Sequence, residues 1–424
     1  MTRDAPALSP FAVFRNRSFS LMWVGQLVST FGDALTQLAA GILVYRLTGS
    51  TLSVGLMLAV TSLPSLLFGL FAGVYVDRYD RKKILVVSSF LQAGLVALIP
   101  LLLPYGVAWL YILVALASTV RQFFLPAHDS VLPEVADDEA LEAANAMMSI
   151  SSSASMVLGF AAAGLLASRF DLRLVFLLDA LTFVVAGLCL LGITVLKHAP
   201  NEEESVRTVL GDMRTGMGYL FGSPMLRSVL FVGMGFGLTM GIFNTLGLPF
   251  VLSELRGGSE LVFGIQEGVM SGGFVLGSMV MASFATKLQA RGWLVLSFMG
   301  MGAASLVYAF GNSVPLAIVL SGIVGLFNAP LVAIKAVFQR KTPPELRGRV
   351  IGAYYVGLDA LVVLGLFVGG LGDLLDVRLI YVVTALLTLL LGLVAAVLPG
   401  LKTVNPVGNE VERSERGAGL EAGG

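Results

Sequence analysis

The sequence predicts an all-α integral membrane protein with 12 transmembrane helices in two pseudo-symmetric six-helix bundles. Three observations lead to this prediction. Hydrophobic residues make up 56% of the 424 residues and charged residues only 13%, about half the charged fraction of an ordinary soluble domain. The apolar residues gather into runs of about 20, the length at which a helix crosses a bilayer core of about 30 Å. The longest polar connection divides these runs into six and six.

Six apolar runs form the first half of the chain. They lie near residues 19–45, 52–76, 84–103, 107–127, 145–167 and 173–196. Each run predicts a helix, because hydrocarbon cannot satisfy exposed backbone donors and acceptors. The first run is much longer than the core of a signal peptide, which is about 7 to 15 residues, so we expect it to remain as a membrane helix. Residues 1–18 are expected to form a cytoplasmic N-terminal segment.

Six further runs follow a polar connection. They lie near residues 226–252, 262–286, 292–310, 314–336, 350–372 and 378–399. The connection at 197–224 carries several acidic and basic residues and is expected to be a cytoplasmic linker between bundles at 19–196 and 225–399. The tail at 400–424 has almost no large apolar residues to offset its ordering entropy, so we expect it to be disordered and cytoplasmic.

Basic residues are distributed unevenly between the two sides of the predicted membrane domain. With the N-terminus inside, 22 of the 27 Lys and Arg residues fall on the inner side. Those on the outer side are Arg46, Arg169, Arg173, Arg256 and Arg378. The positive-inside rule therefore predicts a multi-pass protein of the plasma membrane, that is, a bacterial inner membrane, with both termini in the cytoplasm. No basic patch with interleaved aromatic residues points to nucleic acid as a partner.

Acidic residues inside the apolar runs point to a candidate site. A charge at mid-membrane costs roughly 2.5 to 3.5 kcal/mol, so an acid there must be paired, face water or be protonated. Asp33 is the first candidate for proton coupling or substrate contact. It belongs to a polar stripe on one helical face, formed at spacings of 4, 3 and 4 residues by Gln26, Thr30, Asp33 and Gln37. The alternative is a hydrogen bond that only packs two helices.

Three other acids lie in the apolar runs. Asp359, one helical turn from Tyr355, is a second candidate for the cavity. Asp179 is expected to have a packing role, because its helix would be peripheral. Glu267 is expected near the outer surface, where an acid needs no partner.

Polar groups also occur in the seventh and tenth runs. Asn244 lies in the seventh, while Asn328 and Lys335 are seven residues apart on one face of the tenth. Otherwise the cavity candidates are apolar, for example Met240 and Phe243. A large apolar cavity with few polar groups favours bulky amphipathic solutes over sugars or ions.

The loop after the second run carries a recognisable motif. Residues 73–83 match the pattern G-x-x-x-D-R-x-x-R-[KR] of the major facilitator superfamily, and residues 287–292 form a degenerate counterpart. Five further stretches resemble the macrolide-efflux and enterobactin-exporter branch: 14–33, 126–133, 144–146, 178–183 and 339–349. The resemblance covers about residues 11–400 and implies the major facilitator fold and export by drug:proton antiport. In the fifth run, however, the Gly-Pro pair common in such antiporters is replaced by residues 159–164.

The same resemblance implies a cytoplasmic gate at this motif. Its members are Gly73, Asp77, Arg78, Asp80, Arg81 and Lys82. Gly73 would permit close helix approach, Asp77 would face the inner end of the eleventh helix, and Arg81 would exchange ion pairs during the cycle. The alternative is that the basic residues only set topology and contact anionic lipid. Arg121 resembles the family's helix 4 arginine, with Asp77, Asp129 or a bound anion as partner, or else it snorkels.

Several other protein classes are excluded by the residues present. No Gly-Lys dipeptide occurs, so the phosphate-binding loop of a primary pump is absent. Residues 79–80 and 370–373 match the Y-D and G-x-G-D motifs of intramembrane aspartyl proteases. The predicted topology, however, places Asp80 and Asp373 on opposite sides of the bilayer. A lone Cys189 and two separated histidines, His128 and His198, do not make a metal site. We expect no enzymatic activity, no metal and no cofactor.

The sequence therefore predicts a monomeric secondary transporter that exports amphipathic small molecules, such as a macrolide or a siderophore-like compound, in exchange for protons by alternating access. Substrate, protons and membrane lipids would be its partners. A proton-coupled importer of a small metabolite and a transport-inactive receptor or scaffold remain as alternatives. The intramembrane acids disfavour a scaffold, because a scaffold has no use for charges at such cost.

Overall fold

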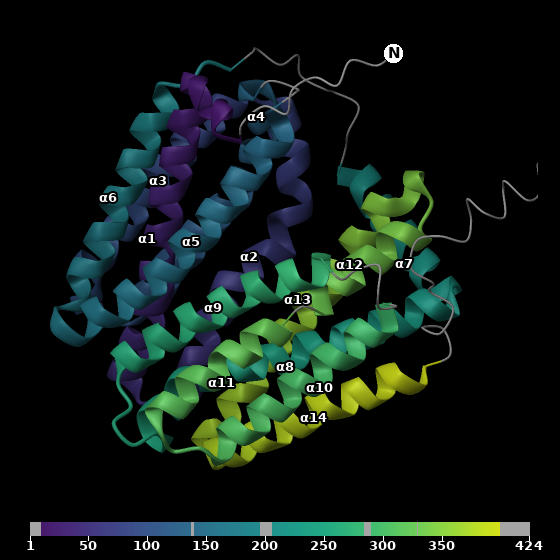
Figure 1. The fold of residues 1–424 in the computed structure, drawn as a ribbon. Helices are drawn as coiled ribbons and strands as arrows, with labels where there is room; N and C mark the ends of the chain where they lie inside the picture. The colour runs from purple at the N-terminus through teal and green to yellow at the C-terminus, as the bar shows by residue number, and fades with distance from the viewer. Residues whose placement is uncertain (1–9, 137–139, 196–205, 284–289, 329, 399–424) are drawn as a thin grey trace, which may run out of the picture.

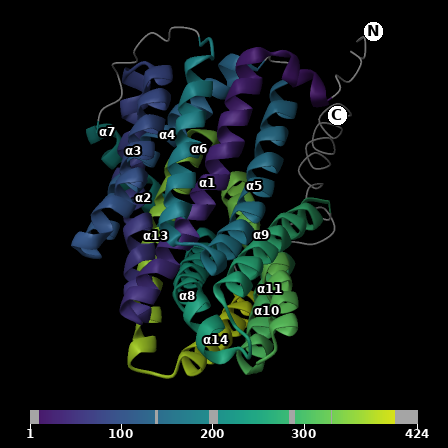
Figure 2. The same ribbon diagram turned by 90° about the vertical axis from the view of Figure 1, so that its left-hand side faces the viewer.

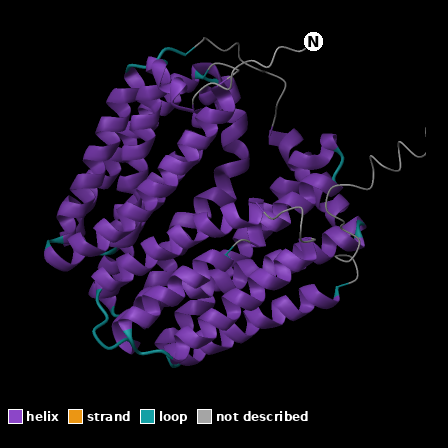
Figure 3. Ribbon diagram, viewed as in Figure 1, coloured by secondary structure: helices purple, strands orange, loops and turns teal. Residues whose placement is uncertain are grey.

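The computed structural model describes residues 10–136, 140–195, 206–283, 290–328 and 330–398. In these ranges the regular secondary structure is helical (Figure 3), and 11 helices are long and apolar enough to cross a membrane. The prediction of an all-α membrane protein is therefore confirmed. The expected disordered tail at 400–424 and His198 lie outside the described residues.

The first bundle contains the six expected helices. They are α1 (Arg17–Thr48), α2 (Thr51–Arg78), α3 (Arg81–Leu102), α4 (Ala108–Val135), α5 (Leu141–Arg169) and α6 (Leu172–Leu191). Asn16, Ser50 and Asp80 cap the first three, because each side chain accepts a hydrogen bond from a backbone N–H of the first turn. Helix α4 continues eight residues beyond its predicted end, since helical hydrogen bonding does not stop where the apolar run does.

The second half of the chain contains α7 (Val206–Gly222), α8 (Pro224–Glu254), α9 (Glu260–Ser283), α10 (Ala290–Phe310), α11 (Val314–Phe327), α12 (Pro330–Lys341), α13 (Arg347–Gly369) and α14 (Val377–Val397). The tenth run was predicted as one helix but is divided into α11 and α12. The break precedes Pro330, because proline has no N–H to donate and is disfavoured inside a continuous helix. Helix α11 is consequently too short to count as a full span, which accounts for 11 long spans instead of 12.

Helix α7 lies in the expected linker and was missed by the search for apolar runs. It is amphipathic, and among its described side chains and glycines Gly216 and Leu220 are buried. Leu220 is fully buried, and a Cβ atom on Gly216 would lie 2.6 Å from the carbonyl carbon of Arg349 at the start of α13. The linker is thus in part a helix docked on the second bundle.

The two bundles form a V (Figure 1), and Figure 2 shows the molecule from the side of the first bundle. They meet at the ends that carry the loops after α1 and α13, and they diverge toward the ends that carry α7 and α12 (Figure 1). We call the first end the clasp end and the other, which carries the loop 78–81, the motif end. Each bundle has its own apolar core, with Phe176 buried in the first and Phe298 in the second.

Polar contacts hold the bundles together at the clasp end. The Nε atom of Arg46 on α1 lies 2.6 Å from Oε1 of Glu260 on α9. Asp373, in the turn that follows α13, contacts the start of α2. It accepts hydrogen bonds from Ser50 Oγ (2.5 Å), from the N–H (2.5 Å) and Oγ1 (2.7 Å) of Thr51, and from the N–H of Leu52 (3.2 Å). These groups form what we call the clasp.

Small residues let the bundles approach closely beside the clasp. Helix α5 crosses α9 at Gly164 and Gly264, where a Cβ atom on Gly164 would lie 2.8 Å from Gly264 Cα and 2.7 Å from the Glu260 carbonyl oxygen. Gly159 instead packs within the first bundle, where its Cβ would lie 2.7 Å from that of Ala34. The stretch that replaces the Gly-Pro pair thus serves two helix crossings, one inside a bundle and one between bundles.

Candidate functional site

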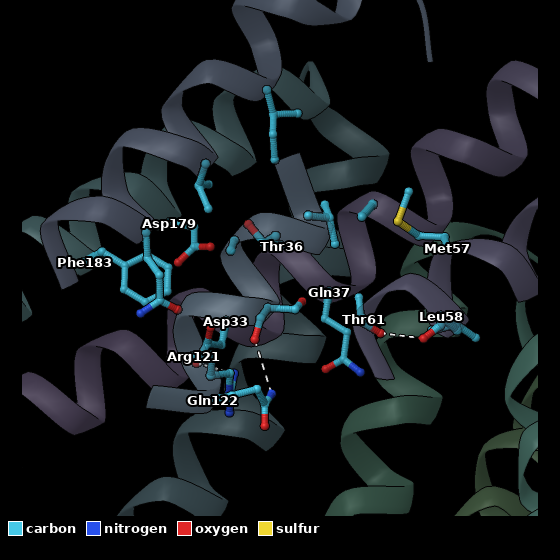
Figure 4. A pocket seen from close by; sticks show the side chains of 17 residues that line it. Asp33, Thr36, Gln37, Met57, Leu58, Thr61, Arg121, Gln122, Asp179 and Phe183 are labelled. Carbon is cyan, nitrogen blue, oxygen red and sulfur yellow. Dashed lines mark hydrogen bonds and ion pairs between the residues drawn. The ribbon is translucent and has the colours of Figure 1, made fainter. Parts of the chain in front are cut away.

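A cavity of about 290 Å³ lies inside the first bundle, among α1, α2, α3, α4 and α6 (Figure 4). Its polar lining consists of Asp33, Thr36, Gln37, Thr61, Gln92, Ser118, Arg121, Gln122 and Asp179. Most of these residues come from runs that hydropathy alone marks as membrane-spanning. So many polar side chains converging in apolar helices indicate a hydrated site rather than a packed core.

An ion pair between Asp33 and Arg121 dominates the cavity. The Nη1 atom of Arg121 on α4 lies 2.7 Å from Oδ2 of Asp33 on α1, and the two side chains are 42% and 27% exposed. Both therefore remain in reach of water. This partner of Arg121 was not predicted: we expected Asp77, Asp129 or a bound anion. Asp129 lies two turns farther along α4, is 82% exposed and contacts His128, which explains why it does not pair with Arg121.

The predicted polar stripe on α1 stays together in the structure. Gln37 lines the main cavity beside Asp33, and Gln26 lines a smaller adjoining pocket that Asp33 and Arg121 also border. The Nε2 group of Gln26 donates a hydrogen bond to Thr30 Oγ1 at 3.0 Å. The helical periodicity therefore identified residues that share one face.

Asp179 lines the same cavity, although we expected it only to pack helices. It is fully buried, its Oδ1 accepts a hydrogen bond from Thr182 Oγ1 (3.0 Å), and its Oδ2 has no partner among the described residues. Helix α6 packs directly on α1 at this point, where a Cβ atom on Gly32 would collide with Asp179 and Thr182. The cavity consequently contains two carboxyl groups and one guanidinium group. The intramembrane position of Asp179 was the available signal, and the assumption that its helix is peripheral hid it.

A second pocket, of about 100 Å³, lies inside the second bundle among α8, α9, α10, α11 and α14. Its polar lining comprises Asn244, Gln266, Glu267, Ser305, Tyr308, Ser321, Asn328 and Tyr381. The predicted residues Asn244 and Asn328 are thus brought together. Lys335 is exposed on α12 instead, because the break after α11 ends the face that it was expected to share with Asn328. Glu267 lines this pocket and not the outer surface.

Asp359 lies in neither pocket. It sits on α13, where its Oδ2 accepts a long hydrogen bond (3.4 Å) from Ser65 Oγ on α2. This contact joins the two bundles midway along α2. The predicted candidates thus occupy three places: one cavity in each bundle and the contact between bundles.

The predicted gate residues lie at the motif end and pair among themselves. Arg81 contacts Asp77 Oδ1 through Nη2 (3.2 Å) and Glu134 Oε1 through Nη1 (2.7 Å). Lys82 donates a hydrogen bond to the Ile193 carbonyl oxygen (2.7 Å), and Asp80 caps α3. Glu134 was missed because it follows the predicted end of the fourth helix.

The structure also bears on two other expectations for this loop, the role of Gly73 and the separation of Asp80 from Asp373. A Cβ atom on Gly73 would meet nothing within 4 Å, so Gly73 mediates no close helix approach in this conformation. Arg78 is exposed at the helix end. Asp80 and Asp373 lie at opposite ends of the molecule, at the α3 cap and in the clasp. They do not form an aspartyl protease dyad.

Comparisons with known proteins agree with this architecture. A family model described as transmembrane secretion effector matches residues 8–414. The multidrug efflux pump Tap of Mycolicibacterium fortuitum is 28% identical over 402 residues, which cover 91% of this chain and 96% of that protein. Macrolide efflux protein A of Streptococcus pyogenes is 26% identical over 341 residues, 78% of this chain and 83% of that protein. The solved nucleoside transporter NupG is similar with a TM-score of 0.73 at 14% identity, covering 90% of this chain and 99% of that chain, which shows the shared fold.

Proposed function

We propose that this chain, which belongs to the transmembrane secretion effector family of the major facilitator superfamily, exports amphipathic drug-like molecules by proton antiport. The chain is a multi-pass membrane transporter and not an enzyme. The names of its relatives, a multidrug pump and a macrolide efflux protein, support export and make a macrolide the first substrate to test. A siderophore-like compound is the second.

The Asp33–Arg121 pair in the hydrated cavity is the observation that carries the proton-coupling part of the proposal. With both carboxyl groups ionised, Asp33, Asp179 and Arg121 give the cavity a net charge of about −1. One proton on either carboxyl group balances the cavity. A proton on Asp33 also weakens its attraction for Arg121, which is then able to reorient. Proton binding and helix rearrangement are thereby linked through one ion pair.

Alternating access would follow from the V of the bundles. The excess of basic residues supports an orientation with the motif end, both termini and the linker at 197–224 in the cytoplasm. On that assignment the structure is open to the cytoplasm and closed to the outside by the clasp. Rocking of the two bundles would break the clasp contacts, close the motif end and release substrate outside, in a protein that acts as a monomer.

Neutralising Asp77 is expected to reduce transport several-fold while the protein stays in the membrane. Asp77→Asn removes an acidic partner of Arg81, and with it the group that we propose to engage the second bundle when the motif end closes. Macrolide efflux is measured for the wild type and the variant, and the abundance of each protein in the membrane is measured by immunoblot. Glu142→Gln, an exposed site on α5 at the same end, is the matched control. Efflux equal to wild type would leave Asp77 and its neighbours with a topogenic role only.

The export proposal is tested by accumulation of a radiolabelled macrolide in cells with and without the protein. We expect several-fold lower accumulation in expressing cells, and we expect a protonophore to abolish the difference, because antiport consumes the proton gradient. Higher accumulation on expression would indicate import instead. Equal accumulation would exclude macrolides, and repeating the assay with a siderophore separates a wrong substrate from a protein that transports nothing.

A further inference from the structure

The pocket in the second bundle occupies the same position as the cavity in the first. Helices α8, α9, α10, α11 and α14 are the seventh, eighth, ninth, tenth and twelfth spans, and the first cavity is lined by the first, second, third, fourth and sixth. The two pockets are therefore related by the pseudo-symmetry of the bundles. They differ in charge: the first contains Arg121, whereas the described lining of the second contains an acid, Glu267, and no Lys or Arg.

Glu267 has no counter-charge in the part of the chain that the structure describes. Its carboxylate forms no ion pair and no hydrogen bond there. Arg378 lies over the ring of Phe250, 5.8 Å from its centroid, but is paired with Glu254 at 2.9 Å. An isolated carboxylate in a membrane span is expensive, so Glu267 requires a proton, water or a cation from outside the protein.

Two neighbouring amide groups each have one polar atom without a partner among the described residues. Gln266 is 96% buried; its Oε1 accepts a hydrogen bond from Tyr308 (3.2 Å), but its Nε2 has no partner among the described residues. The Oδ1 atom of Asn328 is likewise buried and unpartnered there. Since buried polar groups are nearly always hydrogen-bonded, an unused donor and an unused acceptor in residues that line one pocket point to a polar ligand.

Aromatic rings form one wall of the pocket. Tyr381 stands at the centre, with ring centroids 4.8 Å from Phe243 and 5.3 Å from Tyr308. Aromatic faces attract cations as well as apolar groups, and Met240 and Met270 in the same lining adapt to ligands of different shapes. A carboxylate beside aromatic rings is the combination that recognises an organic ammonium group.

We propose that this pocket binds the protonated amine of the exported molecule, with Glu267 as its counter-charge and Tyr381 and Tyr308 as its aromatic wall. The inference rests on the proposed export function and specifies its substrate class as amine-bearing amphipathic cations. At about 100 Å³ the pocket is smaller than the roughly 300 to 1,000 Å³ of a drug-sized site, so it holds the amine head group, and the apolar body extends into the space between the bundles.

Equilibrium binding to the purified full-length protein tests the proposal. The ligands are a macrolide with an ionised tertiary amine and the same macrolide with that nitrogen converted to a neutral amide. Glu267→Gln is expected to weaken binding of the amine form about 10- to 100-fold, the loss for a charge-assisted contact, and to leave the neutral form nearly unchanged. Glu345→Gln, at an exposed acid outside the pocket, is the control and should change neither. Tetraphenylphosphonium serves as a permanently charged probe that is independent of the macrolide scaffold.

Tyr381 provides a second, independent arm. Tyr381→Phe keeps the aromatic face and should retain the preference for the amine form, whereas Tyr381→Leu should lose it. Equal weakening of both ligands by Glu267→Gln, or no weakening of either cation, would overturn the proposal. Failure of the export proposal looks different: the purified protein would still discriminate the charged ligands, while expressing cells would accumulate the macrolide like controls.

Discussion

Asp33→Asn is expected to abolish proton-driven export and to leave substrate exchange intact. Asparagine keeps the size of the side chain but can neither take up a proton nor pair with the Arg121 guanidinium group 2.7 Å away. With one proton exchanged per substrate, a gradient of about one pH unit supports about tenfold accumulation, because one unit corresponds to about 1.4 kcal/mol. An uncoupled carrier only equilibrates its substrate.

Proteoliposomes separate the two activities. Uptake of labelled macrolide driven by a pH gradient reports coupling, and exchange of labelled for unlabelled macrolide at equal pH reports the carrier cycle. The thermal stability of the variant should change little, since Arg121 is 42% exposed and pairs reached by water contribute about 0 to 1 kcal/mol. Asp129→Asn, at an exposed acid on α4, is the matched control. Gradient-driven uptake that survives in Asp33→Asn would move coupling to Asp179, and loss of exchange as well would assign Asp33 to substrate binding or packing.

Gly164→Leu is expected to stop transport by holding the clasp end open. Even a Cβ atom at Gly164 would lie within 3 Å of backbone atoms of Glu260 and Gly264, so a leucine forces α5 and α9 apart. Overpacking of this kind costs about 1 to 3 kcal/mol, which shifts the balance between the two conformations by about 5- to 150-fold. The clasp pair of Arg46 and Glu260 lies beside this crossing and should separate with it.

Thiol labelling detects this opening. In a Cys189→Ser background, Ser118→Cys places one thiol in the cavity of the first bundle. A membrane-impermeant reagent added outside the cell should label this thiol much faster when Gly164→Leu is also present. Gly94→Leu is the control, because a Cβ atom at Gly94 meets nothing within 4 Å. Slow labelling together with normal transport in Gly164→Leu would show that the α5–α9 crossing does not control access.

Local sequence patterns predicted which candidate residues share one helical face, but they did not predict which residues of different helices meet. The spacing of Gln26, Asp33 and Gln37 placed them on one face of α1, and they do border connected pockets. The sequence also marked Arg121, but not its partner on a different helix. Asp179 and Glu267 were identified as intramembrane acids and were then assigned minor roles, because helix order alone does not say which face of a helix turns inward.

The membrane fold was determined by the sequence itself, because the length of an apolar run and the need to satisfy its backbone hydrogen bonds are properties of each segment alone. Even the break at Pro330 follows from local chemistry, although hydropathy does not report it. Pairings such as Asp33 with Arg121 or Asp373 with Thr51 were decided only by the tertiary structure. They depend on the rotation of each helix about its axis and on the close crossings at Gly32, Gly164 and Gly264, where the absence of a side chain lets a distant segment approach and sets which side chains face one another.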